Sequence, residues 1–238
     1  MKAAIFHEYG GPEVIQIEDI PEPEPRPGQV LVEVKAVGLN HLDLFVRQGL
    51  PGIRSVMPHI GGSDFTGVVK ALGPGAEGFE IGQRVIDYPL ESFSGVPYYL
   101  CDDPPPGVFE IIGEQSNGGC CEAIAVNAPS LQPLPEGLSF EEGAACPIAF
   151  ITAWRMLTER AELRPGETLL VQGAGSGVGT AAIQIGKLLG ARVIASTSTP
   201  EKIEGARALG ADEVINYREE SISGRVREIT GKAGANVV

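Results

Sequence analysis

The 238-residue chain is short of positive charge, because 18 Lys and Arg residues stand against 31 Asp and Glu residues, a net charge of −13. An excess of acid on this scale repels both the nucleic-acid backbone and anionic membrane surfaces. Apolar runs also stay well below the roughly 20 residues that a membrane-spanning helix needs. The sequence therefore predicts neither a nucleic acid nor a membrane as partner.

Cysteine is scarce as well, with four residues at positions 101, 120, 121 and 146. Four are too few for a disulfide scaffold, and the vicinal Cys120 and Cys121 can hardly bridge each other without strain. The N-terminus turns acidic by Glu8, so we read no signal peptide there. With 43% hydrophobic residues and its Gly and Pro scattered, the chain is expected to be globular, reduced and cytoplasmic.

Short β-rich runs separated by Gly and Pro fill the first half of the chain. They lie at residues 2–6, 30–37, 65–72, 83–87 and 122–126. The second run alternates with period two, which is typical of a half-buried antiparallel strand. We expect residues 1–126 to form a small antiparallel β-barrel or sandwich domain.

From Ser139 onward the pattern becomes helical. Ser139 and Glu142 match a capping box, and a single apolar helix is expected to follow through Leu157. Further strands are then predicted at 168–171, 192–195, 213–217 and 235–238, alternating with helices at 177–189, 200–209 and 219–230. Such alternation predicts an α/β fold, with a doubly wound parallel sheet over residues 127–238. Because the sequence stops inside the fourth strand, we expect the sheet to be incomplete there and the chain to be a fragment.

The string GAGSGVG lies between the first of these strands and its helix. It comprises Gly173, Ala174, Gly175, Ser176, Gly177, Val178 and Gly179. Glycines at such a turn let the backbone approach a pyrophosphate, and the helix N-terminus that follows offers free N–H groups. We predict a dinucleotide-binding loop. The alternative is that these glycines serve only close packing of helix against sheet.

The residues after the second parallel strand indicate which dinucleotide binds. NAD sites usually place an acid there to accept from the ribose 2′-OH, yet the run at 195–199 holds no acid, and the first acid after this strand is Glu201. The hydroxyls of Ser196 and Thr197, with nearby Lys202, suit a 2′-phosphate better. NADPH is therefore the predicted cofactor, unless Lys202 is an ordinary solvated helix residue.

Several further strings carry a family resemblance: MKAAIFHEYGGPEVI at 1–15, GLNHLDLFVRQG at 38–49, GGSDFTGVV at 61–69, GQRV at 82–85, FITAWRML at 150–157 and GADEVINY at 210–217. On these strings the chain resembles the medium-chain dehydrogenase/reductase superfamily, most closely its zinc-free, NADPH:quinone oxidoreductase-like branch. The resemblance implies an N-terminal GroES-like domain and a Rossmann-type cofactor domain. Hydride would pass between NADPH and a small-molecule quinone, enone or related carbonyl acceptor.

The same resemblance implies roles for individual residues. Asn40 would orient the acceptor or the nicotinamide amide, and Asp43 would shape the same loop. Phe45 stands where some quinone reductases carry a tyrosine. The expected catalytic set is Asn40, Asp43, Phe45, Ser63 and Asp64; Thr152 would lie against the nicotinamide and Tyr217 would reach the adenosine phosphate. The alternatives are that Asn40 satisfies its own turn, that Asp43 is structural, and that Tyr217 is a plain strand-end aromatic.

Metal binding is not expected. Zinc-dependent relatives hold the catalytic ion with a Cys, a His and a further Cys or Asp, and a second ion with four closely spaced cysteines. At the matching positions this chain has Asn40 and Ser63, and only Cys101 falls in the cysteine-rich region. One set remains open as an alternative metal site: His41, His59, Asp64 and Cys146.

Two other functions compete with a zinc-free reductase. One is a truncated, non-catalytic dinucleotide-binding fragment, which would bind cofactor with poor turnover. The other is a zinc-type alcohol dehydrogenase, which would contain stoichiometric zinc. Full-length relatives are implied to be homodimers that build their dimer edge from the region missing here.

Overall fold

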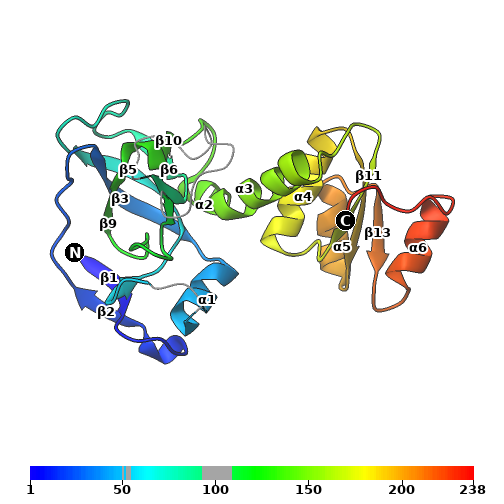
Figure 1. Cartoon of the computed structure of the whole chain (residues 1–238), viewed down its shortest axis with the longest axis horizontal. Coiled ribbons are helices and arrows are strands. Elements are labelled where there is room, and N and C mark those ends of the chain that lie inside the picture. The colour runs from blue at the N-terminus through cyan, green and yellow to red at the C-terminus, as the bar shows by residue number, and fades with distance from the viewer. Residues whose placement is uncertain (50, 52–54, 93–108) are drawn as a thin grey trace. The chain divides into compact units, whose positions relative to one another are not determined.

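The structure, a computed structural model, describes residues 1–49, 51, 55–92 and 109–238 (Figure 1). These residues form two units, Met1–Ile148 and Ala149–Val238. The division falls later than residue 126, because the segment that follows still packs on the first unit. Gly143, for example, lies so close to Thr66 that an added Cβ would come within 2.8 Å of its Cγ2 atom.

The described part of the first unit is built from antiparallel sheets with two complete α-helices. Its strands are β1 (Lys2–Phe6), β2 (Gln16–Asp19), β3 (Gln29–Gly38), β4 (His59–Ile60), β5 (Asp64–Leu72), β6 (Arg84–Asp87), β7 (Leu90–Ser92), β8 (Phe109–Ile111), β9 (Ala123–Asn127) and β10 (Leu131–Pro133). They pair in the orders β2-β1-β4, β10-β6-β5-β3-β9 and β7-β8. The helices are α1 (His41–Gln48) and α2 (Phe140–Ala144), with 3₁₀ turns at Pro12–Val14 and Ala128–Ser130.

The alternation in β3 explains the core of this unit. Val30 and Val32 are fully buried and pack with Phe65, Val69 and Val85 from β5 and β6. All five predicted strand runs are present, with ends shifted by no more than one residue. The short strands β2, β4, β7, β8 and β10, and helix α1, were not predicted.

The second unit holds three parallel strands in the order β11-β12-β13. Its elements are helix α3 (Pro147–Arg155, which begins in the first unit), a π-helical turn (Met156–Arg160), β11 (Thr168–Gln172), α4 (Gly177–Leu188), β12 (Arg192–Thr197), α5 (Pro200–Ala208), β13 (Glu213–Asn216) and α6 (Ile222–Ile229). Two apolar clusters are buried here, one around Ile183 and Val193 and one around Ile194 and Ile215. The predicted α/β class, a β-rich unit followed by a parallel sheet, is confirmed.

Apart from strand and helix ends that move by one or two residues, the structure differs from the sequence prediction in three places. The single apolar helix is two helices, α2 and α3, because Pro147 lacks the N–H that a continuous helix needs and instead opens α3. Helix α6 begins at Ile222 rather than 219, where Ser221 caps it by accepting from Gly224 N at 3.4 Å. The expected fourth strand is a single parallel bridge between Leu169 and Val237.

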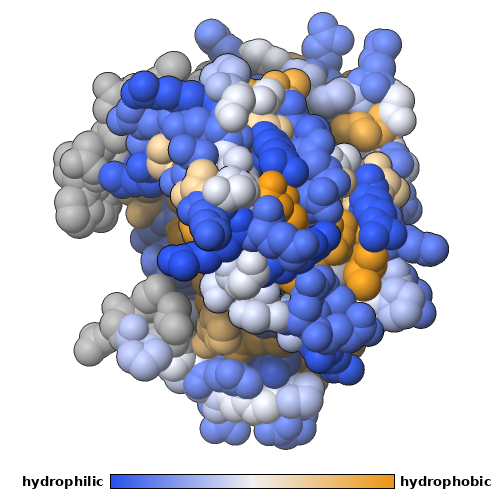
Figure 2. Space-filling model, turned by 90° about the vertical axis from the view of Figure 1, so that its right-hand side faces the viewer, coloured by the Kyte–Doolittle hydropathy of each residue, from blue (hydrophilic) through white to orange (hydrophobic). Residues whose placement is uncertain are grey.

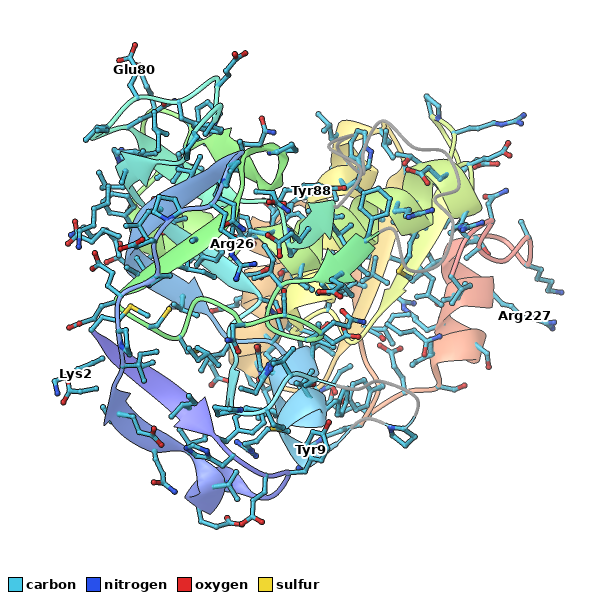
Figure 3. The ribbon with its side chains drawn as sticks, turned by 60° about the vertical axis from the view of Figure 1, so that its left-hand side comes forward. Lys2, Tyr9, Arg26, Glu80, Tyr88 and Arg227 are labelled. Atoms are coloured by element: carbon cyan, nitrogen blue, oxygen red, sulfur yellow. The ribbon has the colours of Figure 1, made fainter. Side chains whose placement is uncertain are left out.

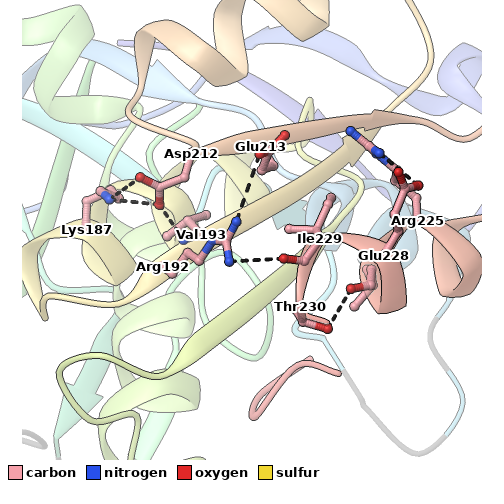
Figure 4. A network of polar contacts seen from close by, with 10 residues as sticks. Lys187, Arg192, Val193, Asp212, Glu213, Arg225, Glu228, Ile229 and Thr230 are labelled. Carbon is pink, nitrogen blue, oxygen red and sulfur yellow. Dashed lines mark hydrogen bonds and ion pairs between the residues drawn. The ribbon is translucent and has the colours of Figure 1, made fainter. Parts of the chain in front are cut away.

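A polar network ties the end of α4 to β12 and to the turn before β13 (Figure 4). Lys187 Nζ lies 2.8 Å from both carboxylate oxygens of Asp212, and Asp212 Oδ2 accepts from Val193 N at 2.7 Å. Arg192 lies 4.0 Å from Glu213 and donates to Ile229 O at 3.3 Å. The fully buried Val193 therefore depends on Asp212 for its hydrogen bond.

Replacing Asp212 with alanine should lower the free energy of unfolding by about 1–3 kcal/mol, because a buried backbone N–H loses its acceptor. Urea unfolding measures this loss. Asp212→Asn, which keeps an oxygen for Val193 N, is the matched control and should recover most of it. Equal losses in both variants would show that the Lys187 ion pair, not the bond to Val193, matters.

No helix among the described residues is long and apolar enough to cross a membrane. The face of the molecule in Figure 2 is largely hydrophilic, with apolar side chains in small separate groups. This agrees with the acid-rich composition.

Candidate functional site

The glycine-rich turn of the second unit joins β11 to α4, as predicted. Gly173 has φ +67°, a conformation that favours glycine. Ser176 is the N-cap of α4, and its Oγ accepts from Gly179 N at 3.1 Å. A Cβ on Gly179 would lie only 2.5 Å from Gly173 O, whereas nothing lies within 4 Å of a Cβ on Gly173. The turn is thus closed tightly on its inner side and open at Gly173.

Lys202 lies against this turn. It is in the first turn of α5, which Thr199 caps by accepting from Lys202 N at 3.4 Å. A Cβ added to Gly175 would come within 2.8 Å of Lys202 Cδ. The aliphatic stem of Lys202 therefore packs on the glycine turn, although the residue as a whole is exposed. An ammonium group carried on that stem adds positive charge beside the N-terminus of α4.

The other predicted cofactor residues of this unit differ in exposure. Ser196 and Thr197, at the end of β12, are only 1% and 2% exposed, and Ser196 Oγ has no partner in the described part of the chain. Tyr217 follows β13, donates its N–H to Thr197 O at 3.1 Å and is 48% exposed. Thr152 is exposed on α3. Of this group, Tyr217 and Thr152 present their side chains at the surface.

At the carboxyl end of β11, described residues line two neighbouring cavities. One, of about 350 Å³, is lined by Ser176, Val178 and Gly179 of the turn among others. The second, of about 620 Å³, has Tyr217 and Arg227 in its lining. Gln172, the last residue of β11, lines both. Ligands of open parallel sheets generally bind at this end of the strands.

In the first unit, Asp43 organises the loop that holds Asn40. Asn40 is the N-cap of α1, and its backbone N donates to Asp43 Oδ2 at 2.7 Å. The other oxygen of Asp43 accepts from Gly62 N at 2.9 Å. One carboxylate therefore joins α1 to the loop at 61–63. The spacing of an Asn three residues before an Asp was the signal that could have predicted this helix.

Helix α1 is fixed at its other end by Tyr9, which lies beside it in Figure 3. Its C-cap, Gly49, has φ +86°, and a Cβ there would lie 3.1 Å from Tyr9 Cγ. Leu44 and Phe45 are 42% and 47% exposed on α1, and the preceding Leu39 is 78% exposed. The start of α1 thus offers an apolar surface beside the amide of Asn40.

Asp64 is a buried carboxyl group that contacts two elements. Its Oδ2 accepts from Asn40 Nδ2 at 2.9 Å, and its two oxygens share Ile148 N at 3.0 and 3.2 Å. Ile148 lies in the first turn of α3. Burial raises the pKa of Asp64 to about 7. The hydrogen bonds from Asn40 and Ile148 act in the opposite direction and lower this pKa, because they favour the charged form.

Asp87 is a second buried acid, and the sequence analysis missed it. Its Oδ1 accepts from Phe65 N at 2.7 Å, whereas its buried Oδ2 has no partner among the residues described. Burial first, and the neighbouring Asp64 second, hold the pKa of Asp87 well above its usual range. The signal was present: Asp87 follows Val85 by two residues in a strand, so it shares the inward face.

The remaining predicted residue of this unit, Ser63, is fully buried, and its Oγ has no partner in the described part of the chain. The four residues of the alternative metal set are not brought together, because no three His, Cys, Asp or Glu side chains of the described residues gather as a metal site. His59 instead contacts two backbone carbonyls, Val56 O at 3.2 Å and Gly113 O at 3.1 Å. Cys101 lies outside the described residues.

The three described cysteines are free thiols. Burial raises the pKa of Cys120 to about 11 and that of Cys121 to about 12. Both are therefore protonated, poorly nucleophilic thiols near neutral pH.

Comparison with known families and structures covers both units. Residues 26–136 match the alcohol dehydrogenase GroES-like domain, and residues 177–238 match the zinc-binding dehydrogenase family. The quinone oxidoreductase of Homo sapiens is 32% identical over 239 aligned residues, which cover all of this chain and 65% of that protein. This chain thus spans about 65% of the length of such curated relatives.

Solved structures agree with this match. The crystal structure of an NAD-dependent alcohol dehydrogenase is 45% identical, with a TM-score of 0.93, covering 99% of this chain and 69% of that one. The quinone oxidoreductase of Escherichia coli complexed with NADPH is 31% identical, with a TM-score of 0.79, covering 98% and 63%. Similarity at this level extends over both units and not only over the glycine-rich turn.

Proposed function

The chain belongs to the medium-chain dehydrogenase/reductase superfamily, and from this premise we propose that it is an NADPH-dependent oxidoreductase that reduces a quinone, enone or related carbonyl acceptor without zinc. The observation that carries the proposal is the glycine turn with the stem of Lys202 packed on Gly175. A bound nicotinamide cofactor would supply the hydride for such a reduction.

The residues of the turn fit a dinucleotide. Gly173 leaves its outer side open, and Ser176 begins α4, whose first N–H groups are donors for a pyrophosphate. The exposed Lys202 and Tyr217 support binding of a 2′-phosphate by these two side chains, whereas the hydroxyl-bearing residues Ser196 and Thr197 are buried. One relative named above is NAD-dependent and another was solved with NADPH. In this chain Lys202 favours NADPH.

The first unit offers what an activated acceptor needs. Asn40 supplies a side-chain amide that Asp64 holds in place, and Leu39, Leu44 and Phe45 supply exposed apolar surface for a flat, weakly polar ring. Asn40 and Ser63 stand at positions that hold zinc ligands in zinc-dependent relatives, and neither is an amino acid that zinc prefers. Elemental analysis of the purified chain should accordingly find no stoichiometric zinc.

The proposal is tested by fluorescence titration of the purified chain with NADPH and with NADH, followed by assay of 1,4-benzoquinone reduction. Saturable binding with NADPH the tighter ligand, together with turnover, is the expected result. Tighter NADH binding would overturn the choice of cofactor. Binding without turnover would favour a dinucleotide-binding protein that is not itself a reductase.

Replacing Lys202 with alanine should weaken NADPH binding about tenfold and leave NADH binding within about twofold, because a charge-assisted bond to the 2′-phosphate is lost. The two dissociation constants measure this directly. Lys232→Ala, at another surface lysine of the same unit, is the control and should change neither. A parallel loss for both cofactors in K202A would assign Lys202 to packing of the turn instead of to the 2′-phosphate.

A further inference from the structure

Two carboxyl groups are buried on neighbouring strands behind the Asn40 loop. Asp64 is the first residue of β5 and Asp87 is the last residue of β6. Asp64 is only 2% exposed and Asp87 only 3% exposed. Phe65, the residue after Asp64, donates its N–H to Asp87 Oδ1. Two neighbouring carboxyl groups held away from water do not both ionise readily, so the pair retains a proton.

The hydrogen bonds show which group retains it. Asp64 accepts from Asn40 Nδ2 and from Ile148 N, and Ile148 belongs to the first turn of α3, where a helix favours an anion. Asp87 has only backbone donors, Phe65 N on Oδ1 and its own N–H, and its buried Oδ2 has no hydrogen-bond partner among the described residues. A buried charge without donors costs more than a neutral carboxylic acid there. Asp64 is therefore the group of the pair that ionises first, and the proton that the pair retains belongs on Oδ2 of Asp87.

The charge on Asp64 fixes which way the amide of Asn40 faces. An ionised carboxylate can only accept, so it binds the nitrogen end of the amide. A neutral carboxylic acid can also donate, and it would bind the oxygen end equally well. With one hydrogen of Nδ2 given to Asp64, the second remains for another acceptor.

We infer that Asp64 is a positioning residue: held as an anion by protonated Asp87, it keeps the Asn40 amide oriented to donate to the carbonyl oxygen of the bound acceptor. The inference rests on the proposed reductase function and deepens it. Negative charge develops on that oxygen as hydride arrives at the acceptor, and a donor already fixed in place stabilises it.

The groups facing Asp64 come from each packed element. Asp43 of α1 and Asp87 of β6 are acidic, and the Cys146 thiol lies between α2 and α3. No cation is among the groups that shift Asp64. Its charge consequently depends on the N–H donors and on the neutral form of Asp87.

The test compares the wild-type chain with Asp64→Asn and Asp87→Asn. D64N should lower kcat for NADPH-dependent reduction of 1,4-benzoquinone at least tenfold, with the Kd for NADPH unchanged. Wild-type kcat should rise with pH through an acidic limb near pH 7 as Asp64 ionises. D87N should keep that limb in place, since Asp87 is already neutral. Glu77→Gln, at an exposed loop position, is the control and should follow the wild type throughout.

Carboxyl and side-chain amide NMR provides a readout that needs no turnover. One aspartate carboxyl signal, absent in D64N, should change its chemical shift with a midpoint near pH 7. The Asn40 side-chain amide signals should change over the same pH range. A second aspartate carboxyl signal, absent in D87N, should keep the chemical shift of a protonated carboxyl group up to pH 8.

Different failures remain distinguishable. If the NMR result is as expected but NADPH does not bind, the assigned charges of Asp64 and Asp87 are supported and the proposed reductase function fails. A downward move of the acidic limb, or of the Asp64 titration, by a unit or more in D87N would overturn the inference, because it would show Asp87 carrying the charge. Both carboxyl carbons titrating near pH 4 would overturn it as well.

Discussion

Gly179→Val should abolish NADPH binding, raising the dissociation constant at least a hundredfold, and should lower the free energy of unfolding by about 2–3 kcal/mol. Its Cβ would meet Gly173 O at 2.5 Å and Ala174 Cα at 3.0 Å, both of them backbone atoms. The turn can accept the side chain only by opening. The N–H groups at the start of α4 would then no longer be arranged around a pyrophosphate.

Fluorescence titration and urea unfolding measure the two effects separately. Gly205→Ala is the matched control, since Gly205 is exposed in α5 with nothing within 4 Å of an added Cβ. The G205A variant should bind NADPH normally. Its free energy of unfolding should rise by up to about 1 kcal/mol, because alanine favours the helical conformation more than glycine does. Normal NADPH binding by G179V would mean that the dinucleotide does not bind at this turn.

The second large effect is a loss of stability with rising pH that depends on Asp64. In the unfolded chain an aspartate has a pKa near 4, whereas in the folded chain that of Asp64 is raised to about 7. Between these values the folded chain binds more protons than the unfolded one, so the free energy of unfolding falls as pH rises. A difference of about three pKa units corresponds to roughly 4 kcal/mol between pH 4 and pH 8.

Urea unfolding of wild type and Asp64→Asn at several pH values between 4 and 8 checks this. The D64N curve should be flatter than the wild-type curve by about that amount, whatever its offset at pH 4. Groups that do not contact Asp64 titrate equally in both proteins, so the difference reports Asp64 together with its effect on Asp87, whose pKa Asp64 helps to raise. Parallel curves for the two proteins would show that the Asp64 pKa is not raised.

Much of the second unit could be predicted from the sequence, because its signals are local. The glycine string between an apolar strand and a helix, the Thr199–Pro200 start of α5 and the capping box at Ser139 each act within a few residues. Each specifies backbone geometry through φ angles or a cap, with no need of distant partners. The α/β class and the position of the glycine-rich turn followed from them.

The sequence by itself also determined that acid outweighs base, that Lys202 follows the second parallel strand closely and that Asn40 and Asp43 have capping spacing. Only the tertiary structure decided which of these groups meet. Asp64 reaches Asn40 across 24 positions and Ile148 across 84, and Asp87 joins them because β5 and β6 pair. Ser196 and Thr197 are buried by the packing of β12 between its neighbours. Burial and partnership set the charge of a carboxyl group, and both depend on residues far away in the chain.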